Sequence, residues 1–149
     1  MQQALFFFIA VLAGVLLPLQ AGLNTELGRA VNSPVYAAFL SFIVGSLGLL
    51  AYCLIARDVQ LADIRGGVQL PWVYWTGGLM GAFYVAAIII LTPKLGVALT
   101  FGLTVAGQMV FSVVVDHYGW LGVPVHPINW VRTIGVLLIV GGVVLIRTN

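Results

Sequence analysis

Polar side chains recur at every fourth position through an apolar stretch near residue 100: Thr100, Thr104, Gln108, Ser112 and Asp116. Each step of four turns about 40° around a helix axis, so Thr100, Thr104 and Gln108 share a face. Amides and hydroxyls on one face can hydrogen-bond a polar solute, although hydroxyls also bond carbonyls of their own helix. Two interpretations stay open, a substrate-binding face and a face that joins helices.

A second pair of amides, Gln20 and Asn24, lies in the first apolar stretch, four residues apart and therefore on one helix face. Pro18 precedes them and has no N–H to offer the carbonyl of Gly14, so we expect a helix kink between these residues. Gln20 and Asn24 are candidates for a substrate wall or for interhelical hydrogen bonds. Tyr84, in a later apolar stretch, is a further candidate for a hydroxyl that points inward.

Two carboxylates near helix ends, Glu26 and Asp116, are the candidates for proton coupling. An acid in the middle of a membrane helix would mark a proton site more clearly, and the apolar stretches hold none. Glu26 lies three residues before Arg29, so a simple ion pair is the competing interpretation. Asp116 and His117 could relay a proton, although an aspartate at a helix end is ordinarily solvated.

Several other chemistries find no support in the residue pattern. Neither histidine has the spacing of a metal site, and phosphate-binding loops, nucleophile elbows and Cys/His clusters are missing from the sequence. We therefore predict no metal, no cofactor and no enzyme activity. The net charge of +2 comes from basic residues that stand singly between apolar runs, which indicates anchors at helix ends and no nucleic-acid partner.

The composition requires lipid as the solvent for most of the chain. Hydrophobic residues make up 62% and charged residues 7%, against about 25% charged in soluble domains. Spans of roughly 20 apolar residues predict an all-α integral membrane protein with five transmembrane helices in a single domain, residues 1–149. The expected helices cover about 4–23, 34–56, 71–92, 95–115 and 130–146. Ser33 should cap the second helix ahead of Pro34, and Pro93–Lys94 should separate the third from the fourth.

Small residues at four-residue spacing predict where helix backbones approach closely. These helix-packing candidates are Ser41, Gly45, Gly77, Gly78 and Gly81.

The charges of the connecting loops do not fix an orientation. With the N-terminus inside, three basic residues fall on each side, Arg57, Arg65 and Arg132 inside and Arg29, Lys94 and Arg147 outside. Since the positive-inside rule is tied, either weaker cues orient the chain or it inserts both ways up. Opposite copies of an odd-helix chain would pair as an antiparallel homodimer, which reproduces the inverted repeat of many secondary transporters.

In combination, the following residues resemble the bacterial YdcZ-like family of the drug/metabolite transporter superfamily: Gln20 to Asn24 with Leu27, Gly28 and Arg29; Ser33 and Pro34; Ser41, Phe42 and Gly45; Gly77, Gly78, Gly81, Phe83 and Tyr84; Pro93 to Gly96; Gly107 and Gln108; Asp116 to Gly119; and Arg132, Gly135 and Gly142. The resemblance implies a multi-pass protein of the bacterial inner (plasma) membrane, of transporter class. The small multidrug resistance proteins are more distantly similar. Their helix-one glutamate has no counterpart among Ala13, Gly14 and Val15, which puts that coupling device and a cationic substrate in doubt.

Together these features predict a half-transporter that moves a small organic molecule as an antiparallel homodimer in the lipid bilayer. The expected substrate site holds Gln20, Asn24, Tyr84, Thr100, Thr104 and Gln108. The rival interpretation is a membrane subunit or scaffold that transports nothing and whose polar face only joins helices.

Overall fold

The structure, a computed structural model, describes residues 2–56 and 68–148, which are almost entirely helical. The helices are α1 (Gln2–Ala30), α2 (Pro34–Ala56), α4 (Gly77–Leu95), α5 (Val97–Tyr118) and α6 (Trp130–Thr148). Two short 3₁₀ turns, η1 (Trp72–Thr76) and η2 (Trp120–Gly122), precede α4 and follow α5. Within the described ranges five helical segments are long and apolar enough to span a membrane, as expected, with η1 and α4 forming one of them.

Burial in these helices is the reverse of that in a soluble protein. Most of the buried residues are small or polar, such as Asn24, Thr25, Ala37 and Thr100, whereas large hydrophobic side chains lie exposed along every span. Phe8 is 65% exposed and Thr100 is 1% exposed. Such a surface is stable only in lipid, which confirms an all-α integral membrane protein.

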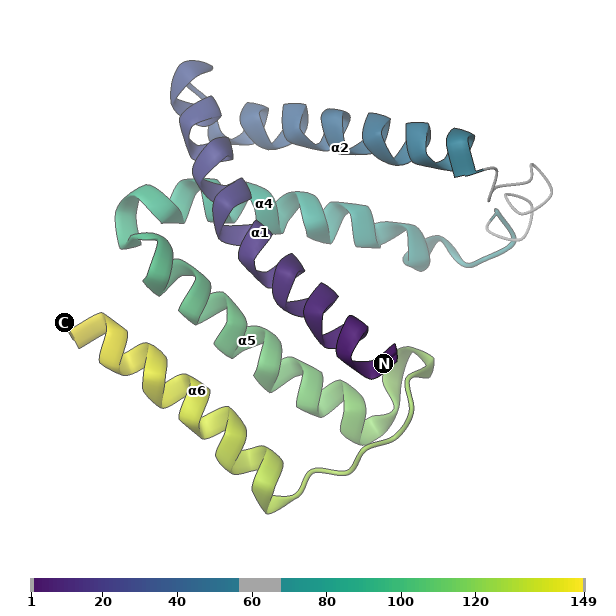
Figure 1. Cartoon of the computed structure of the whole chain (residues 1–149), viewed down its shortest axis with the longest axis vertical. Coiled ribbons are helices and arrows are strands. Elements are labelled where there is room, and N and C mark those ends of the chain that lie inside the picture. The colour runs from purple at the N-terminus through teal and green to yellow at the C-terminus, as the bar shows by residue number, and fades with distance from the viewer. Residues whose placement is uncertain (1, 57–67, 149) are drawn as a thin grey trace. The chain divides into compact units, whose positions relative to one another are not determined.

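The chain forms two compact units, residues 1–93 and 94–149, and we describe each by itself. In the first unit α1 turns sharply into α2 (Figure 1). Asn32 adopts a positive φ of 51°, and the Ser33 N–H donates to the Gly28 carbonyl at 3.0 Å. The Ser33 hydroxyl then accepts the Tyr36 N–H at 3.1 Å. Ser33 is therefore the predicted N-cap, with Pro34 at the first helical position.

The core of this unit lies beside the turn, where α1, α2 and α4 meet. Ala37, Ala38 and Ile89 are buried and form one cluster. A Cβ placed on Gly28 would lie 3.2 Å from Ile89 Cγ2 and 3.6 Å from Pro34 Cα. Gly28 therefore lets three helices approach at one point.

Several helices extend a few residues beyond their expected ends. The first helix continues past residue 23 to Ala30, as the sequence allows, since no residue after Leu23 breaks it. The third helix passes through Pro93 and ends at Leu95, which corrects the break expected at Pro93–Lys94. Proline removes one backbone hydrogen bond, but the chain turns at Gly96, whose φ of 80° and ψ of 161° favour glycine.

In the second unit α5 and α6 pack side by side in antiparallel directions (Figure 1). A Cβ on Gly102 would lie 3.0 Å from Val143 Cγ2, so this glycine lies at a close contact between the two helices. Gly119, with a φ of 62°, ends α5 in the left-handed conformation that favours glycine. Asn129 caps α6, since its side-chain oxygen accepts the Arg132 N–H at 2.9 Å.

Candidate functional site

Two adjoining cavities of about 420 and 200 Å³ form a groove in the first unit. Gln20 and Ser41 line both cavities, and we call the combined feature the polar groove. The larger cavity is completed by Leu16, Leu17, Leu19, Leu23 and Asn24. The smaller one is completed by Phe42, Gly45, Ser46, Leu49 and Val85. These volumes fit a small organic molecule, whose sites usually measure roughly 300–1,000 Å³.

Asn24 is the most informative residue of the polar groove. It is 7% exposed, and its amide has no hydrogen-bond partner among residues 2–56 and 68–148. The neighbouring Thr25 is equally buried, but its hydroxyl donates to the Ala21 carbonyl at 2.7 Å. The amide atoms themselves are not enclosed, since the buried side-chain atom without a partner among the described residues is Thr92 Oγ1. The Asn24 amide is therefore accessible from the groove and free to bond a group that enters it.

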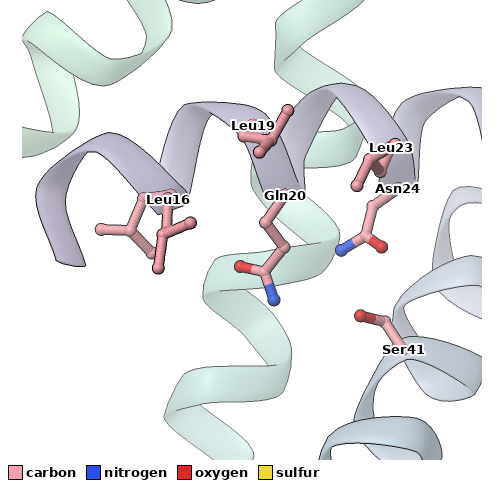
Figure 2. A pocket seen from close by; sticks show the side chains of 7 residues that line it. Leu16, Leu19, Gln20, Leu23, Asn24 and Ser41 are labelled. Atoms are coloured by element: carbon pink, nitrogen blue, oxygen red, sulfur yellow. The ribbon is translucent and has the colours of Figure 1, made fainter. Parts of the chain in front are cut away.

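Three polar side chains converge on the same space. The amides of Gln20 and Asn24 both extend from α1 toward α2, and the Ser41 hydroxyl extends from α2 toward them (Figure 2). Gln20 and Asn24 share one face of α1, as the four-residue spacing predicts. At 1.5 Å per residue, Asn24 lies about 7 Å and Gln20 about 14 Å along α1 from Arg29. The polar groove therefore lies beside the apolar part of α1, close to the end of the helix that carries charged residues.

The groove has no charge of its own within the described ranges, because none of its lining residues is ionisable. Arg29, near the end of α1, forms an ion pair with Glu26 through its Nη1 atom. Both side chains are largely exposed. The pairing interpretation of Glu26 is therefore confirmed.

The polar face predicted on the fourth helix is divided between buried and exposed positions on α5. Thr100 is buried, and its hydroxyl donates to the Gly96 carbonyl at 2.7 Å. Thr104 is half-buried and donates to the Phe101 carbonyl at 3.0 Å. Gln108 is exposed and makes no side-chain hydrogen bond within residues 2–56 and 68–148. The two hydroxyls are thus used within their own helix, and Gln108 alone keeps a free amide.

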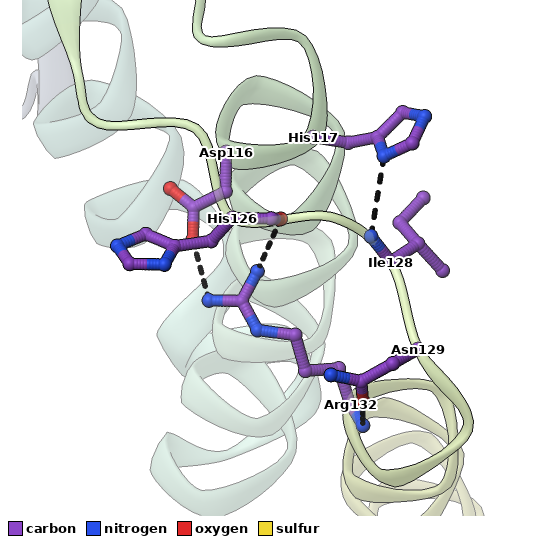
Figure 3. Close-up of polar contacts among 6 residues, drawn as sticks. All are labelled: Asp116, His117, His126, Ile128, Asn129 and Arg132. Carbon is purple, nitrogen blue, oxygen red and sulfur yellow. Dashed lines mark hydrogen bonds and ion pairs between the residues drawn. The ribbon is translucent and has the colours of Figure 1, made fainter.

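A cluster of polar contacts closes the loop between α5 and α6 (Figure 3). Arg132 Nη2 donates to Asp116 Oδ2 at 2.9 Å, and its Nη1 donates to the His126 carbonyl at 2.9 Å. The His126 N–H donates to the Asp116 carbonyl at 2.8 Å. His117 Nδ1 accepts the Ile128 N–H at 3.2 Å. Asp116 is therefore half-buried and ion-paired rather than simply solvated, which corrects that interpretation.

The remaining predicted residues lie apart from the groove or in open space. Pro18 lies within one continuous helix, and a Cβ on Gly14 would meet no atom within 4 Å. Tyr84 is half-buried but lines neither cavity of the polar groove. The Cβ positions of Gly45, Gly77 and Gly78 are also open, while that of Gly81 would lie 3.5 Å from the Phe42 ring. Helix packing through the open glycines stays a prediction for contacts beyond the single chain. Arg57 and Arg65, which entered the loop-charge comparison, lie outside the described residues.

Sequence reasoning placed Ser41 in helix packing and did not identify it as a residue of the groove. Ser41 and Ser46 are hydroxyl side chains inside the apolar α2, and that polarity is the signal that could have marked them. The sequence also left Arg132 without a role. Its partner Asp116 lies 16 residues earlier, so the pairing depends on how the loop folds and no local spacing signals it.

A scan against known families matches residues 5–145 to the family described as "Putative inner membrane exporter, YdcZ". The match covers nearly the whole chain, so the protein belongs to the YdcZ family. It is a multi-pass protein of the inner membrane and of transporter class. No curated protein and no solved structure matches the chain.

Proposed function

We propose that this member of the YdcZ family is a small secondary transporter that exports a small organic molecule, and that the polar groove binds it. The observation that carries the proposal is Asn24, a residue only 7% exposed, whose amide opens into the groove and makes no hydrogen bond among the described residues. A ligand that hydrogen-bonds this amide gains roughly 0.5–1.5 kcal/mol from the bond.

The working unit in this proposal is an antiparallel homodimer of chains inserted in opposite orientations. Gln20 and Gln108 are amides on helix surfaces that the single chain leaves exposed among large apolar side chains. In a bilayer such groups require cover by protein or water, and a second copy supplies it. The tie in loop charges and the odd number of spans also support this arrangement.

In this dimer the two predicted walls contribute to substrate binding together with Tyr84. Gln20 and Asn24 provide the amides of one wall, and Gln108 provides the amide of the other. Thr100 and Thr104 support the second wall, because their hydroxyls bond carbonyls of α5. Alternating access results from one copy rocking against the other around small-residue contacts such as Gly45, Gly77 and Gly78. Glu26 and Asp116 are both ion-paired to arginines within their own chain. Proton coupling through Glu26 or Asp116 therefore requires that its ion pair opens during transport.

The proposal is tested by reconstituting the protein in liposomes and measuring protein-dependent flux across a panel of small organic solutes. If the protein is a transporter, the native protein should produce flux of at least one solute. Asn24→Leu and Gln108→Ala should abolish that flux without lowering the yield of dimer. The lipid-facing variant Leu12→Ala should transport as the native protein does, because Leu12 lies outside the groove. Loss of function with loss of dimer would favour the rival role of a scaffold whose amides only join helices.

Topology is a separate measurement. A tag at the C-terminus should be labelled from both sides of the membrane if the chains insert in both orientations. Labelling from one side alone would exclude the antiparallel dimer. The flux measurements would then still test whether the polar groove binds the transported molecule.

A further inference from the structure

The lining of the polar groove indicates which chemical class of molecule it accepts. Its polar atoms come from two primary amides, Gln20 and Asn24, and two hydroxyls, Ser41 and Ser46. Each amide offers two donors and an acceptor oxygen, and each hydroxyl offers one donor and two lone pairs. Such a lining can both donate hydrogen bonds to and accept them from the amide or hydroxyl groups of a ligand.

A charged ligand has no counter-ion in this groove. The nearest charged residues along α1, Glu26 and Arg29, are largely exposed and neutralise each other. Moving an ion from water into a site of low polarity without a partner is strongly unfavourable. Neither an anion nor a cation is therefore stabilised by the described residues.

The rest of the lining is apolar. Leu16, Leu17, Leu19 and Leu23 border the amides in the larger cavity, and Phe42, Leu49 and Val85 do so in the smaller one. A ligand that fills the groove must therefore present an apolar body beside its hydrogen-bonding group, as in most small-molecule sites.

We propose that the transported molecule is uncharged and amphipathic, with an amide or hydroxyl group that pairs with Asn24 and an apolar side group that packs on the leucines of α1. Asn24 is the specificity-determining residue, because it is the most buried of the polar residues that line the groove and its amide is free to bond a ligand. This inference rests on the proposed function, since it names the substrate class of the same groove.

Three probes that share the leucine side chain and differ in charge test the inference. N-acetyl-leucinamide is neutral, N-acetyl-leucine is an anion at neutral pH, and leucinamide is a cation below its amine pKa. Binding is measured as a thermal shift of the purified protein at pH 6.5. Flux is measured in liposomes at the same pH, with leak into protein-free vesicles subtracted.

The neutral probe should bind and move at least tenfold better than either charged probe. Asn24→Leu should remove this binding, while Thr25→Val, at a hydroxyl already bonded within the helix, should leave it unchanged. Asn24→Asp, nearly equal in shape, should lose the neutral probe and gain affinity for leucinamide, because a carboxylate supplies the missing counter-ion.

The outcomes separate the inference from the proposed function. Preference of the native protein for a charged probe overturns the substrate class and leaves transport standing. Binding of the neutral probe through Asn24 without flux upholds the class of ligand and overturns transport. If no probe binds or moves, both are overturned for this groove.

Discussion

Arg132 reaches back over the loop to Asp116, and its Nη2 atom lies 2.9 Å from Asp116 Oδ2. Both side chains are about two-thirds buried. The same guanidinium also donates to the His126 carbonyl, so one side chain joins the end of α5, the loop and the start of α6. This contact fixes how the two helices of the second unit are connected.

Removal of either partner should destabilise the hairpin. We expect Asp116→Asn and Arg132→Gln each to lower the free energy of unfolding by about 1–2 kcal/mol, since a half-buried charge loses its partner. Denaturation in mixed micelles, followed by the fluorescence of Trp120 and Trp130, measures the change. The double variant should lose less than the two single losses added together. Strict additivity would show that the pair contributes no coupling energy.

Asn24→Leu should separate stability from function. Leucine has nearly the shape of asparagine and replaces an unbonded amide in a groove lined mainly by leucines, so we expect a gain in stability of about 1 kcal/mol together with loss of transport. Unfolding in micelles and liposome flux measure the two effects. A clear loss of stability would instead show that Asn24 is hydrogen-bonded within the assembled protein, as in the helix-joining interpretation.

Gly28 and Gly45 provide a matched pair of variants that also separates an effect on stability from an effect on transport. Gly28→Leu should lower stability by roughly 1–3 kcal/mol, because its side chain would meet Ile89 and the Pro34 backbone in the core. Gly45→Leu has open space in the single chain but extends from the wall of the polar groove. It should therefore fold normally and transport poorly. Equal stability of both variants would contradict the packing described around Gly28.

Gly96→Ala should strain the connection between α4 and α5. A φ of 80° with a ψ of 161° lies in a region that alanine rarely adopts, and the expected loss of stability is about 1–3 kcal/mol. Gly107→Ala is the control, because Gly107 lies inside α5 with no atom within 4 Å of its Cβ position. That change should be neutral or slightly stabilising. Thermal unfolding of the two variants in detergent would show the difference.

The sequence was sufficient for features that depend on local physics. Apolar length located the five spans, and Ser33–Pro34 located the cap of α2. The four-residue spacing placed Gln20 and Asn24 on one face. Features that depend on which helices meet could not be read in this way. The approach of Ser41 to Asn24, the pairing of Arg132 with Asp116 and the packing at Gly28 each require the fold.

Pro93 and Gly96 show the same difference between what local sequence predicts and what the fold decides. Pro93 was expected to end a helix because it lacks an N–H, yet Gly96 ends it. The missing hydrogen bond is tolerated in the last turn of a helix, whereas the end of the helix at Gly96 has a backbone conformation that glycine adopts readily. Local sequence places such a break within a few residues, and the backbone geometry decides the position.

Gly96 also has a consequence for how the protein is made. It is the single residue between α4 and α5, so the ribosome delivers two membrane spans with no hydrophilic segment between them to be carried across the bilayer. Lys94 is the one charged residue beside this connection. During biosynthesis, the anchoring of this connection at one face of the bilayer therefore depends on a single lysine.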